Sequence, residues 1–263
     1  MRRREKKGFS GRRKGADYRE DEQFILLGKN ASFAVTEAYK TLRTNVMFSL
    51  PAEEDRGKLI GITSVNKGEG KSTNSINLAL SIAELGKKVL YLDCDLRLSM
   101  MEKRLNLSAV QGLSNILVGL CEPEDAILPF GDTGLDIISA GEYPPNPSEI
   151  LESARMRELC DMLSRKYDYI IADLPPAGVL SDALIVSKYI DGIIIVVRQE
   201  YSESGKLKEV VRQLKFAQAK ILGFIFCDHT EKQGGKYGRE KAYSYGTSRS
   251  APKGFNDNTG AAK

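Results

Sequence analysis

Residues 66–73 read NKGEGKST, between an apolar segment, KLIGITSV (58–65), and a segment with helical apolar spacing, NSINLALSIAELG (74–86). A strand that enters a glycine-rich GK[ST] loop and leaves as a helix is the setting of a phosphate-binding loop. Glycines allow backbone N–H groups to point at phosphate oxygens, and the start of the helix adds positive potential. The sequence therefore predicts a nucleotide site built from Lys67, Gly68, Glu69, Gly70, Lys71, Ser72 and Thr73.

Two side chains of this loop have expected roles in the chemistry. Lys71 is expected to reach the β- and γ-phosphates, and the Ser72 hydroxyl to bind Mg²⁺. The loop departs from the GxxxxGK[ST] pattern at its first position, which is Val65. A glycine-rich turn without a ligand is the alternative interpretation, but the strand before the loop and the helix after it favour phosphate binding.

Acidic residues end two further apolar segments, VLYLDCD (89–95) and YDYIIAD (167–173). The carboxyl ends of parallel strands meet at the sheet edge that also carries the phosphate loop. Solvated strand ends are the alternative, and three aspartates beside one phosphate loop make it less favoured. The expected Mg²⁺ ligands are Ser72, Asp93 and Asp173, and the expected catalytic residues are Lys71, Asp93 and Asp95. Which of Asp93 and Asp95 accepts the proton and which binds the metal stays open.

Apolar strands alternate with helical patterns along the rest of the chain. Strands are expected at 58–65, 87–95, 134–140, 167–175, 191–199 and 220–227. Helices are expected at 32–50 with Thr36 as a possible cap, 71–86 closed by Gly86, 112–120, 146–166 with Pro147 at its start, 181–190 and 204–218. This order predicts an α/β fold, a mostly parallel sheet with helices on both faces, of the P-loop NTPase type with a deviant Walker motif.

The charge of the chain is unevenly distributed. Residues 1–16 hold eight Lys or Arg residues and one Glu, which leaves 31 basic and 34 acidic residues in the other part of the chain. A slightly acidic body argues against a broad nucleic-acid-binding face. The basic segment 1–21 is expected to be disordered. Residues 1–16 are expected either to favour anionic membrane surfaces or only to aid solubility.

Composition sets further limits on the protein. The four cysteines are scattered without a CxxC pair, so a reducing, cytoplasmic setting fits better than a zinc site or a disulfide framework. No apolar run approaches the length of a membrane span. The expected organisation is a tail at 1–21, one domain at 22–228 and a flexible, tyrosine-bearing tail at 229–263.

Four segments in the right order resemble the bacterial tyrosine kinases of capsular and exopolysaccharide synthesis. They are GEGKST (68–73), VLYLDCDLR (89–97), SAGEYPPNPSEIL (139–151) and YDYIIADLPPAG (167–178). EAYKTLRTN (37–45) is similar to the N-terminal motif of the same family, so the likeness covers about residues 32–228. The resemblance implies an ATP- and Mg²⁺-dependent protein tyrosine kinase that phosphorylates its own tail at Tyr237, Tyr243 and Tyr245.

The resemblance also implies partners. The helix at 32–50 is expected to form a ring-like homo-oligomer through Glu37, Lys40 and Arg43, although the family motif ExxRxxR has arginine where this chain has Lys40. A separate membrane-embedded activator of the polysaccharide chain-length-regulator type would hold the kinase at the inner face of the plasma membrane, and a tyrosine phosphatase would reset it. The family places Thr or Ser where this chain has Leu174, and little effect is expected from that difference.

Two other functions remain open at this point. A partitioning or septum-positioning ATPase shares the loop and Asp173, but its signature lysine would fall at Asn66, for which Lys67 is at best a partial substitute. A nucleotide-gated scaffold would keep the phosphate loop and need no acceptor tyrosines. Arg97 has two possible roles as well, because it could touch phosphate or brace a loop.

Overall fold

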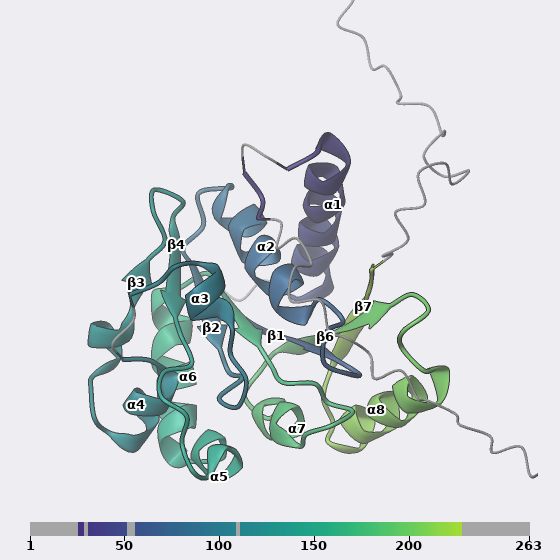
Figure 1. The fold of residues 1–263 in the computed structure, drawn as a ribbon. Helices are drawn as coiled ribbons and strands as arrows, with labels where there is room; N and C mark the ends of the chain where they lie inside the picture. The colour runs from purple at the N-terminus through teal and green to yellow at the C-terminus, as the bar shows by residue number, and fades with distance from the viewer. Residues whose placement is uncertain (1–25, 29–30, 52–55, 109–110, 228–263) are drawn as a thin grey trace, which may run out of the picture. The chain divides into compact units, whose positions relative to one another are not determined.

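The fold is described by a computed structural model, which covers residues 26–28, 31–51, 56–108 and 111–227 (Figure 1). The predicted tails at 1–21 and 229–263, with the predicted acceptor tyrosines Tyr237, Tyr243 and Tyr245, lie outside the described residues. Among the described residues, no helix combines the length and the apolar character that crossing a bilayer requires.

The described part of the chain builds a seven-stranded sheet in the order β3-β4-β2-β5-β1-β6-β7. Neighbouring strands are parallel, except that β3 runs antiparallel to β4. Five of the strands, including the central β5 and its neighbours β1 and β2, are buried over most or all of their length, as apolar segments covered on both faces should be. The strands are Lys58–Ser64 (β1), Val89–Asp93 (β2), Leu128–Pro129 (β3), Leu135–Ile138 (β4), Tyr169–Asp173 (β5), Gly192–Arg198 (β6) and Ile221–Cys227 (β7).

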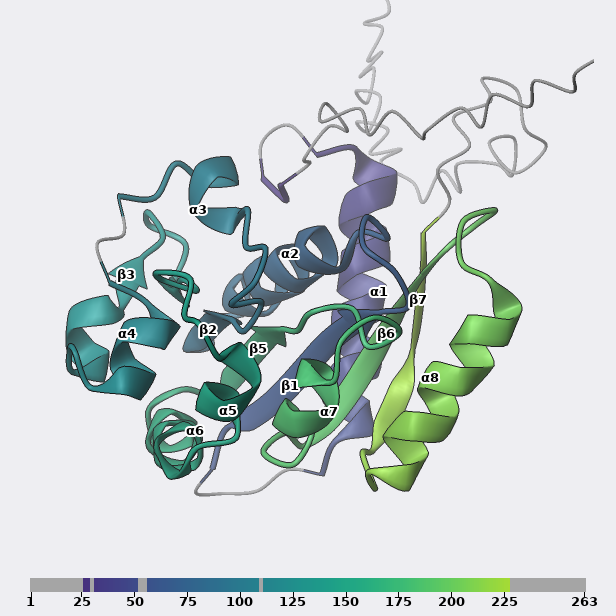
Figure 2. The ribbon, with the colours of Figure 1, turned by 60° about the horizontal axis from the view of Figure 1, so that its bottom comes forward.

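Helices cover both faces of this sheet, which confirms the predicted α/β class (Figure 2). One apolar cluster lies between the sheet and α1 to α3, and a second lies between the sheet and α4 to α8. The helices are Phe33–Ser49 (α1), Lys71–Ala83 (α2), Met101–Arg104 (α3), Leu113–Val118 (α4), Pro147–Leu151 (α5), Ala154–Lys166 (α6), Asp182–Val186 (α7) and Ser204–Phe216 (α8).

Strand register brings the acidic strand ends together. Asp93, the last residue of β2, pairs in register with Asp173, the last residue of β5. Ile62 of β1 pairs with Asp173 from the other side, and β1 then leads into the phosphate loop. The carboxyl ends of β1, β2 and β5 therefore meet at one edge, as predicted from the sequence.

Local details differ from the expectations in two helices. Ser32, not Thr36, caps α1, because its side chain accepts the N–H of Val35 while Thr36 already lies in the first turn. The single helix expected at 146–166 is divided into α5 and α6, because the side chain of Ser153 accepts the N–H of Met156 and starts a new helix.

Three short elements were not predicted, and they are β3, α3 and a 3₁₀-helix at Pro123–Ala126. Each has at most four residues, too few for a periodic pattern to be visible in the sequence. The expected end of the helix after the phosphate loop is close to the observed one. The helix α2 stops at Ala83, and Gly86 follows with a φ of 75°, a left-handed value that suits glycine.

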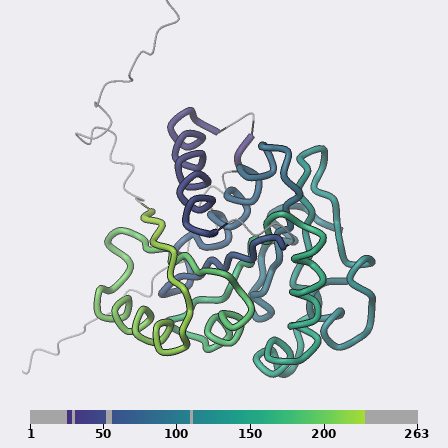
Figure 3. The backbone as a smooth tube through the Cα atoms, turned by 180° about the vertical axis from the view of Figure 1, so that it is seen from behind, coloured from purple at the N-terminus to yellow at the C-terminus, as the bar shows by residue number. Residues whose placement is uncertain are grey.

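The helix α1 lies beside α2 and close to the edge strand β7 (Figure 3). Val46 and Leu50 at its C-terminal end are buried in the same apolar cluster that receives Leu222 from β7. Lys220 Nζ also donates to the carbonyl of Ser49 at 3.4 Å. The N-terminal helix is thus an integral part of the described fold.

Candidate nucleotide-binding and catalytic site

The phosphate loop has the backbone that its glycines predict. Gly68 has a φ of 82° and Gly70 a φ of 90°, both in the left-handed region where a Cβ atom is strained. Val65, which replaces the first glycine of the pattern, is not among the described non-glycine residues with a positive φ. Valine is therefore tolerated at that position, and α2 begins directly after the loop at Lys71.

Two residues expected to bind nucleotide have different surroundings. Lys67 is exposed, whereas the side chain of Glu69 is almost fully buried under the loop. Glu69 Oε2 accepts the N–H of Val65 at 2.8 Å, and Oε1 accepts Asn66 Nδ2 at 3.0 Å. Glu69 thus holds the loop from beneath, and only its backbone N–H is suited to face a phosphate.

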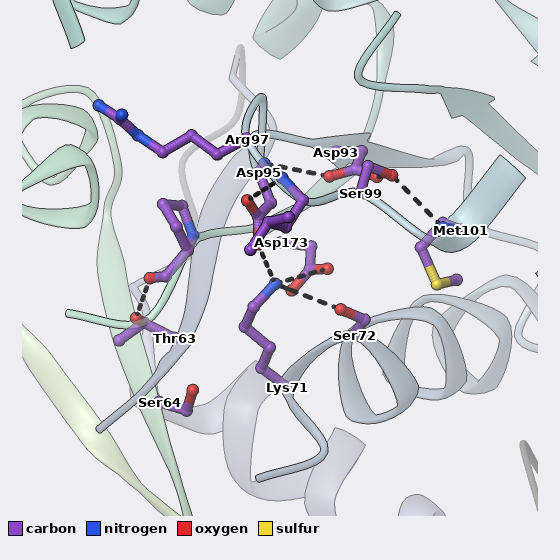
Figure 4. A network of polar contacts seen from close by, with 12 residues as sticks. Thr63, Ser64, Lys71, Ser72, Asp93, Asp95, Arg97, Ser99, Met101 and Asp173 are labelled. Atoms are coloured by element: carbon purple, nitrogen blue, oxygen red, sulfur yellow. Dashed lines mark hydrogen bonds and ion pairs between the residues drawn. The ribbon is translucent and has the colours of Figure 1, made fainter. Parts of the chain in front are cut away.

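Lys71 lies at the centre of the acidic cluster (Figure 4). Its Nζ is 3.0 Å from Asp95 Oδ2, 3.4 Å from both carboxylate oxygens of Asp173, and 3.3 Å from Ser72 Oγ. Burial by itself lowers the pKa of Lys71, but the nearby aspartates raise it above its usual value, so the side chain stays charged. The structure therefore brings together Lys71, Ser72, Asp95 and Asp173.

Asp93 and Asp95 both reach this cluster because the chain turns immediately after β2. The N–H of Asp95 donates to Asp93 Oδ1 at 3.0 Å, and Ser99 Oγ donates to Asp93 Oδ2. Burial, followed by the charge of Asp173, raises the pKa of Asp93 to about 7. Two carboxylates at the ends of neighbouring strands repel each other, and a bound cation would relieve that repulsion.

Three polar side chains around the aspartates were not identified from the sequence. Tyr91 Oη donates to Asp173 Oδ2 at 3.1 Å, and Ser75 Oγ donates to Asp173 Oδ1 at 3.2 Å. Ser99 serves Asp93 in the same way. Tyr91 lies on the same strand as Asp93, two residues before it, and Ser75 lies one helical turn after Lys71. The signal available in the sequence for Tyr91 was a polar residue in an otherwise apolar strand.

Arg97 makes the contacts of a loop brace, one of the two roles that the sequence left open. Its Nε donates to Asp182 Oδ2 at 2.7 Å, and its Nη2 donates to Ser148 Oγ at 2.8 Å. Ser148 Oγ donates in turn to Asp182 Oδ1 at 2.6 Å, and the Asp182 side chain is about 1% exposed. This network ties the segment that carries Asp95 to the starts of α5 and α7, and it explains the serine of the PPNPSE motif.

The expected oligomerisation residues divide into two groups. Glu37 and Lys40 are about half exposed and form an ion pair of 2.8 Å on the outer side of α1. Arg43 is only 12% exposed, because its guanidinium donates to the carbonyl of Ser81 and lies 3.7 Å from Glu84 on α2. In the described fold, Arg43 therefore fastens α1 to α2 within one chain.

The side chains at this edge fit a divalent cation held together with a nucleotide. In the part of the chain that the structure covers, no three His, Cys, Asp or Glu side chains are arranged to enclose a metal by themselves. Magnesium in nucleotide sites usually keeps several waters and takes one or two carboxylates with the phosphates. The hydroxyl of Ser72 and the crowded pair of Asp93 and Asp173 provide such a partial shell.

A family model described as an AAA domain matches residues 57–223 of the chain. The septum site-determining protein MinD from Pyrococcus horikoshii, solved with Mg-ADP, is similar in structure, with a TM-score of 0.56 and 30% identity over 65% of this chain and 70% of that one. The fold, the loop at 66–73 and these likenesses define the chain as a P-loop NTPase, a class of protein that binds a nucleotide with a divalent metal.

More extensive likenesses define the family. The tyrosine-protein kinase YwqD of Bacillus subtilis is 35% identical over 211 residues, which are 80% of this chain and 85% of that protein. The kinase domain of the Escherichia coli tyrosine kinase ETK has a TM-score of 0.71 and 33% identity, with 80% of each chain covered. The chain belongs to the bacterial tyrosine kinase family, and it is a protein-tyrosine kinase.

Proposed function

We propose that this protein transfers the γ-phosphoryl group of ATP to its own tail tyrosines, Tyr237, Tyr243 and Tyr245. The observation that carries the proposal is the convergence of Lys71 with three aspartates at the ends of β1, β2 and β5. Phosphoryl transfer needs positioning and charge neutralisation more than covalent help from the enzyme, and this constellation offers both.

Each group has a definite task in this proposal. The backbone N–H groups of residues 67–73 and the charge of Lys71 bind the phosphates, which compete with Asp95 and Asp173 for its Nζ. Ser72, Asp93 and Asp173 would hold Mg²⁺, which when bound neutralises charge on the phosphates. The tyrosine oxygen attacks the γ-phosphorus, the bond to the β–γ bridging oxygen breaks, and Asp93 or Asp95 accepts the hydroxyl proton.

The described part of the chain ends close to the phosphate loop, at the residue from which the tail continues. Asn74 Nδ2 donates to the carbonyl of Gly70 at 2.9 Å and contacts Cys227 Sγ at 3.3 Å. The last described residue, Cys227, therefore lies beside the phosphate loop. Tyr237 follows ten residues later, and ten extended residues span at most about 35 Å. The span from Cys227 to Tyr237 is therefore long enough for the tail to reach the phosphate loop of its own subunit.

The family membership supports a wider setting for this kinase. We infer a ring-like homo-oligomer that acts in capsular or exopolysaccharide synthesis and is held at the inner face of the plasma membrane by a separate membrane-embedded activator of the chain-length-regulator type. A tyrosine phosphatase would remove the phosphates. Each phosphate adds nearly two negative charges to a tail rich in lysine and arginine, so accumulated phosphates would reverse its charge and loosen the assembly.

A test of the phosphate site compares γ-phosphate incorporation by the parent protein and by Lys71→Arg. Methionine at this position would leave buried carboxylates without a partner, whereas arginine keeps the positive charge beside Asp95 and Asp173. We expect Lys71→Arg to retain the parent's circular dichroism spectrum and to lose at least about 100-fold in activity, because a planar guanidinium does not replace the compact ammonium. Undiminished incorporation would reject the assignment.

A further inference from the structure

The segment between β6 and α8, residues 198–202, contacts the outer side of the phosphate loop, and we call it the brace loop. Tyr201 Oη donates to the carbonyl of Lys67 at 3.0 Å. Arg198 Nη1 donates to the carbonyl of Gly68 at 2.9 Å. Two consecutive carbonyl groups of the phosphate loop are therefore held from outside by side chains that lie about 130 residues further along the chain.

A third contact joins the brace loop to the interior of the phosphate loop. Ser202 Oγ donates to Glu69 Oε1 at 2.7 Å. The Glu69 carboxylate is about 1% exposed, and it also holds the N–H of Val65 and the amide of Asn66. The brace loop thus donates a further hydrogen bond to a buried carboxylate. Leaving a buried charge without its hydrogen-bond partners is strongly unfavourable.

The brace loop has a fixed conformation of its own. Glu200 has a φ of 57°, a left-handed value that is unfavourable for a non-glycine residue. The N–H of Arg198 donates to Ser202 Oγ at 2.8 Å, and the Arg198 guanidinium lies 5.4 Å from the centre of the Tyr201 ring. These contacts direct the Tyr201 hydroxyl towards the phosphate loop.

The orientation of the carbonyl groups of Lys67 and Gly68 affects how the phosphate loop binds phosphate. Its N–H groups bind phosphate only when they point inward, and a peptide unit that turns its N–H inward turns its C=O outward. A carbonyl that flipped inward would present a negative dipole to the phosphates. The hydrogen bonds from Tyr201 and Arg198 stabilise the outward orientation at Lys67 and Gly68, where a glycine makes the backbone easy to flip.

We propose that the brace loop is a positioning element that keeps the phosphate loop in its nucleotide-binding conformation and thereby sets nucleotide affinity. This inference rests on the proposed role of residues 66–73 as the phosphate site. Arg198, Tyr201 and Ser202 act through the loop backbone and through Glu69, and not by contact with the reacting atoms. Their loss should therefore weaken binding more than it slows the chemical step.

The test measures the affinity of a fluorescent ADP analogue with Mg²⁺, and the KM and kcat for ATP, in the parent protein and in Tyr201→Phe. One lost hydrogen bond of ordinary strength predicts three- to tenfold weaker binding with kcat within about twofold. Tyr189→Phe is the matched control, because its hydroxyl also donates to a backbone carbonyl, that of Glu152 at 3.2 Å, away from the phosphate loop.

The possible results separate two claims. Weaker binding by Tyr201→Phe, with parental binding by Tyr189→Phe, supports the positioning role. Parental affinity in Tyr201→Phe, equal weakening in both variants, or a loss confined to kcat overturns the positioning role and leaves the phosphate site intact. Failure of the parent protein itself to bind the nucleotide overturns the assignment of residues 66–73, and the positioning role with it.

Discussion

Lys71 places a positive charge in direct contact with a cluster of three aspartates. Asp93, Asp95 and Asp173 all lie at least nine-tenths buried around it, so the cluster carries an excess of negative charge when its aspartates are ionised. Buried like charges are unfavourable unless a cation or a proton balances them. Burial is the main cause of the raised pKa of Asp93, and the charge of Asp173 adds to it. A divalent cation bound with the phosphates would offset the repulsion between these carboxylates.

Replacing Asp93 by Asn should stabilise the protein measured without nucleotide and metal. The folded protein raises the pKa of Asp93 from 3.8 to about 7, so it binds the proton more tightly than the unfolded chain does. The free energy of unfolding of the parent protein therefore falls as the pH rises from about 4 towards 7. Asparagine does not ionise, so the variant does not lose this stability. At pH 8 the shift alone corresponds to about 4 kcal/mol. The asparagine amide has one oxygen in place of two and cannot accept from both Ser99 Oγ and the N–H of Asp95, so we expect a net gain of about 1 kcal/mol, or a rise in Tm of about 3 °C.

Differential scanning calorimetry at pH 8 checks this expectation, and Asp132→Asn serves as control because Asp132 is exposed in a turn. The same Asp93→Asn protein should lose most of its Mg²⁺-dependent activity, since one of the proposed ligands is gone. A lower Tm with normal activity would show that Asp93 has neither the strained charge nor the catalytic role assigned to it.

At the scale of elements, α1 has an inner and an outer side with different tasks. The inner side carries Tyr39, whose hydroxyl donates to Asn74 Oδ1 at 3.1 Å, and the largely buried Arg43. The outer side carries the exposed pair of Glu37 and Lys40. Self-association through α1 should therefore respond to the outer residues, whereas changes on the inner side should first affect how α1 packs against α2.

Lys40→Arg should strengthen self-association, because it restores the family motif and offers a partner carboxylate two parallel hydrogen bonds. We expect the dissociation constant of the oligomer to fall by at least about threefold in sedimentation velocity runs. Arg43→Ala should instead lower the free energy of unfolding by about 1–3 kcal/mol, through its lost contacts to Ser81 and Glu84. Unchanged sedimentation of Lys40→Arg would contradict an assembly role for this position.

The long elements could be predicted from the sequence, because their apolar periods extend over several turns or strand residues. The phosphate loop and Asp173 could be predicted for a different reason, since motif and strand order together place them at one edge. The break between α5 and α6 could not be predicted, because a serine such as Ser153 is compatible both with a helix interior and with a helix N-cap. The bracing role of Arg97 could not be predicted either, because it depends on Asp182, which is 85 residues away. The role of the brace loop likewise depends on contacts between residues far apart in the sequence.

The whole molecule combines a slightly acidic body with basic ends. Eight of the 39 Lys and Arg residues lie in the first 16 positions, and the tail after Cys227 holds both basic residues and the proposed acceptor tyrosines. The catalytic edge is acidic and the proposed acceptor tail is basic, so the two carry complementary charges. Phosphorylation would remove this complementarity and release the product.

The most direct measurement is a map of phosphorylation sites by peptide mass spectrometry after incubation with Mg-ATP. The parent protein should carry phosphotyrosine at Tyr237, Tyr243 and Tyr245, Lys71→Arg should carry none, and changing all three tyrosines to Phe should leave ATP binding intact while removing the signal. Hydrolysis of ATP without phosphotyrosine, or phosphate confined to serine and threonine, would contradict the account and favour a nucleotide switch that resembles MinD.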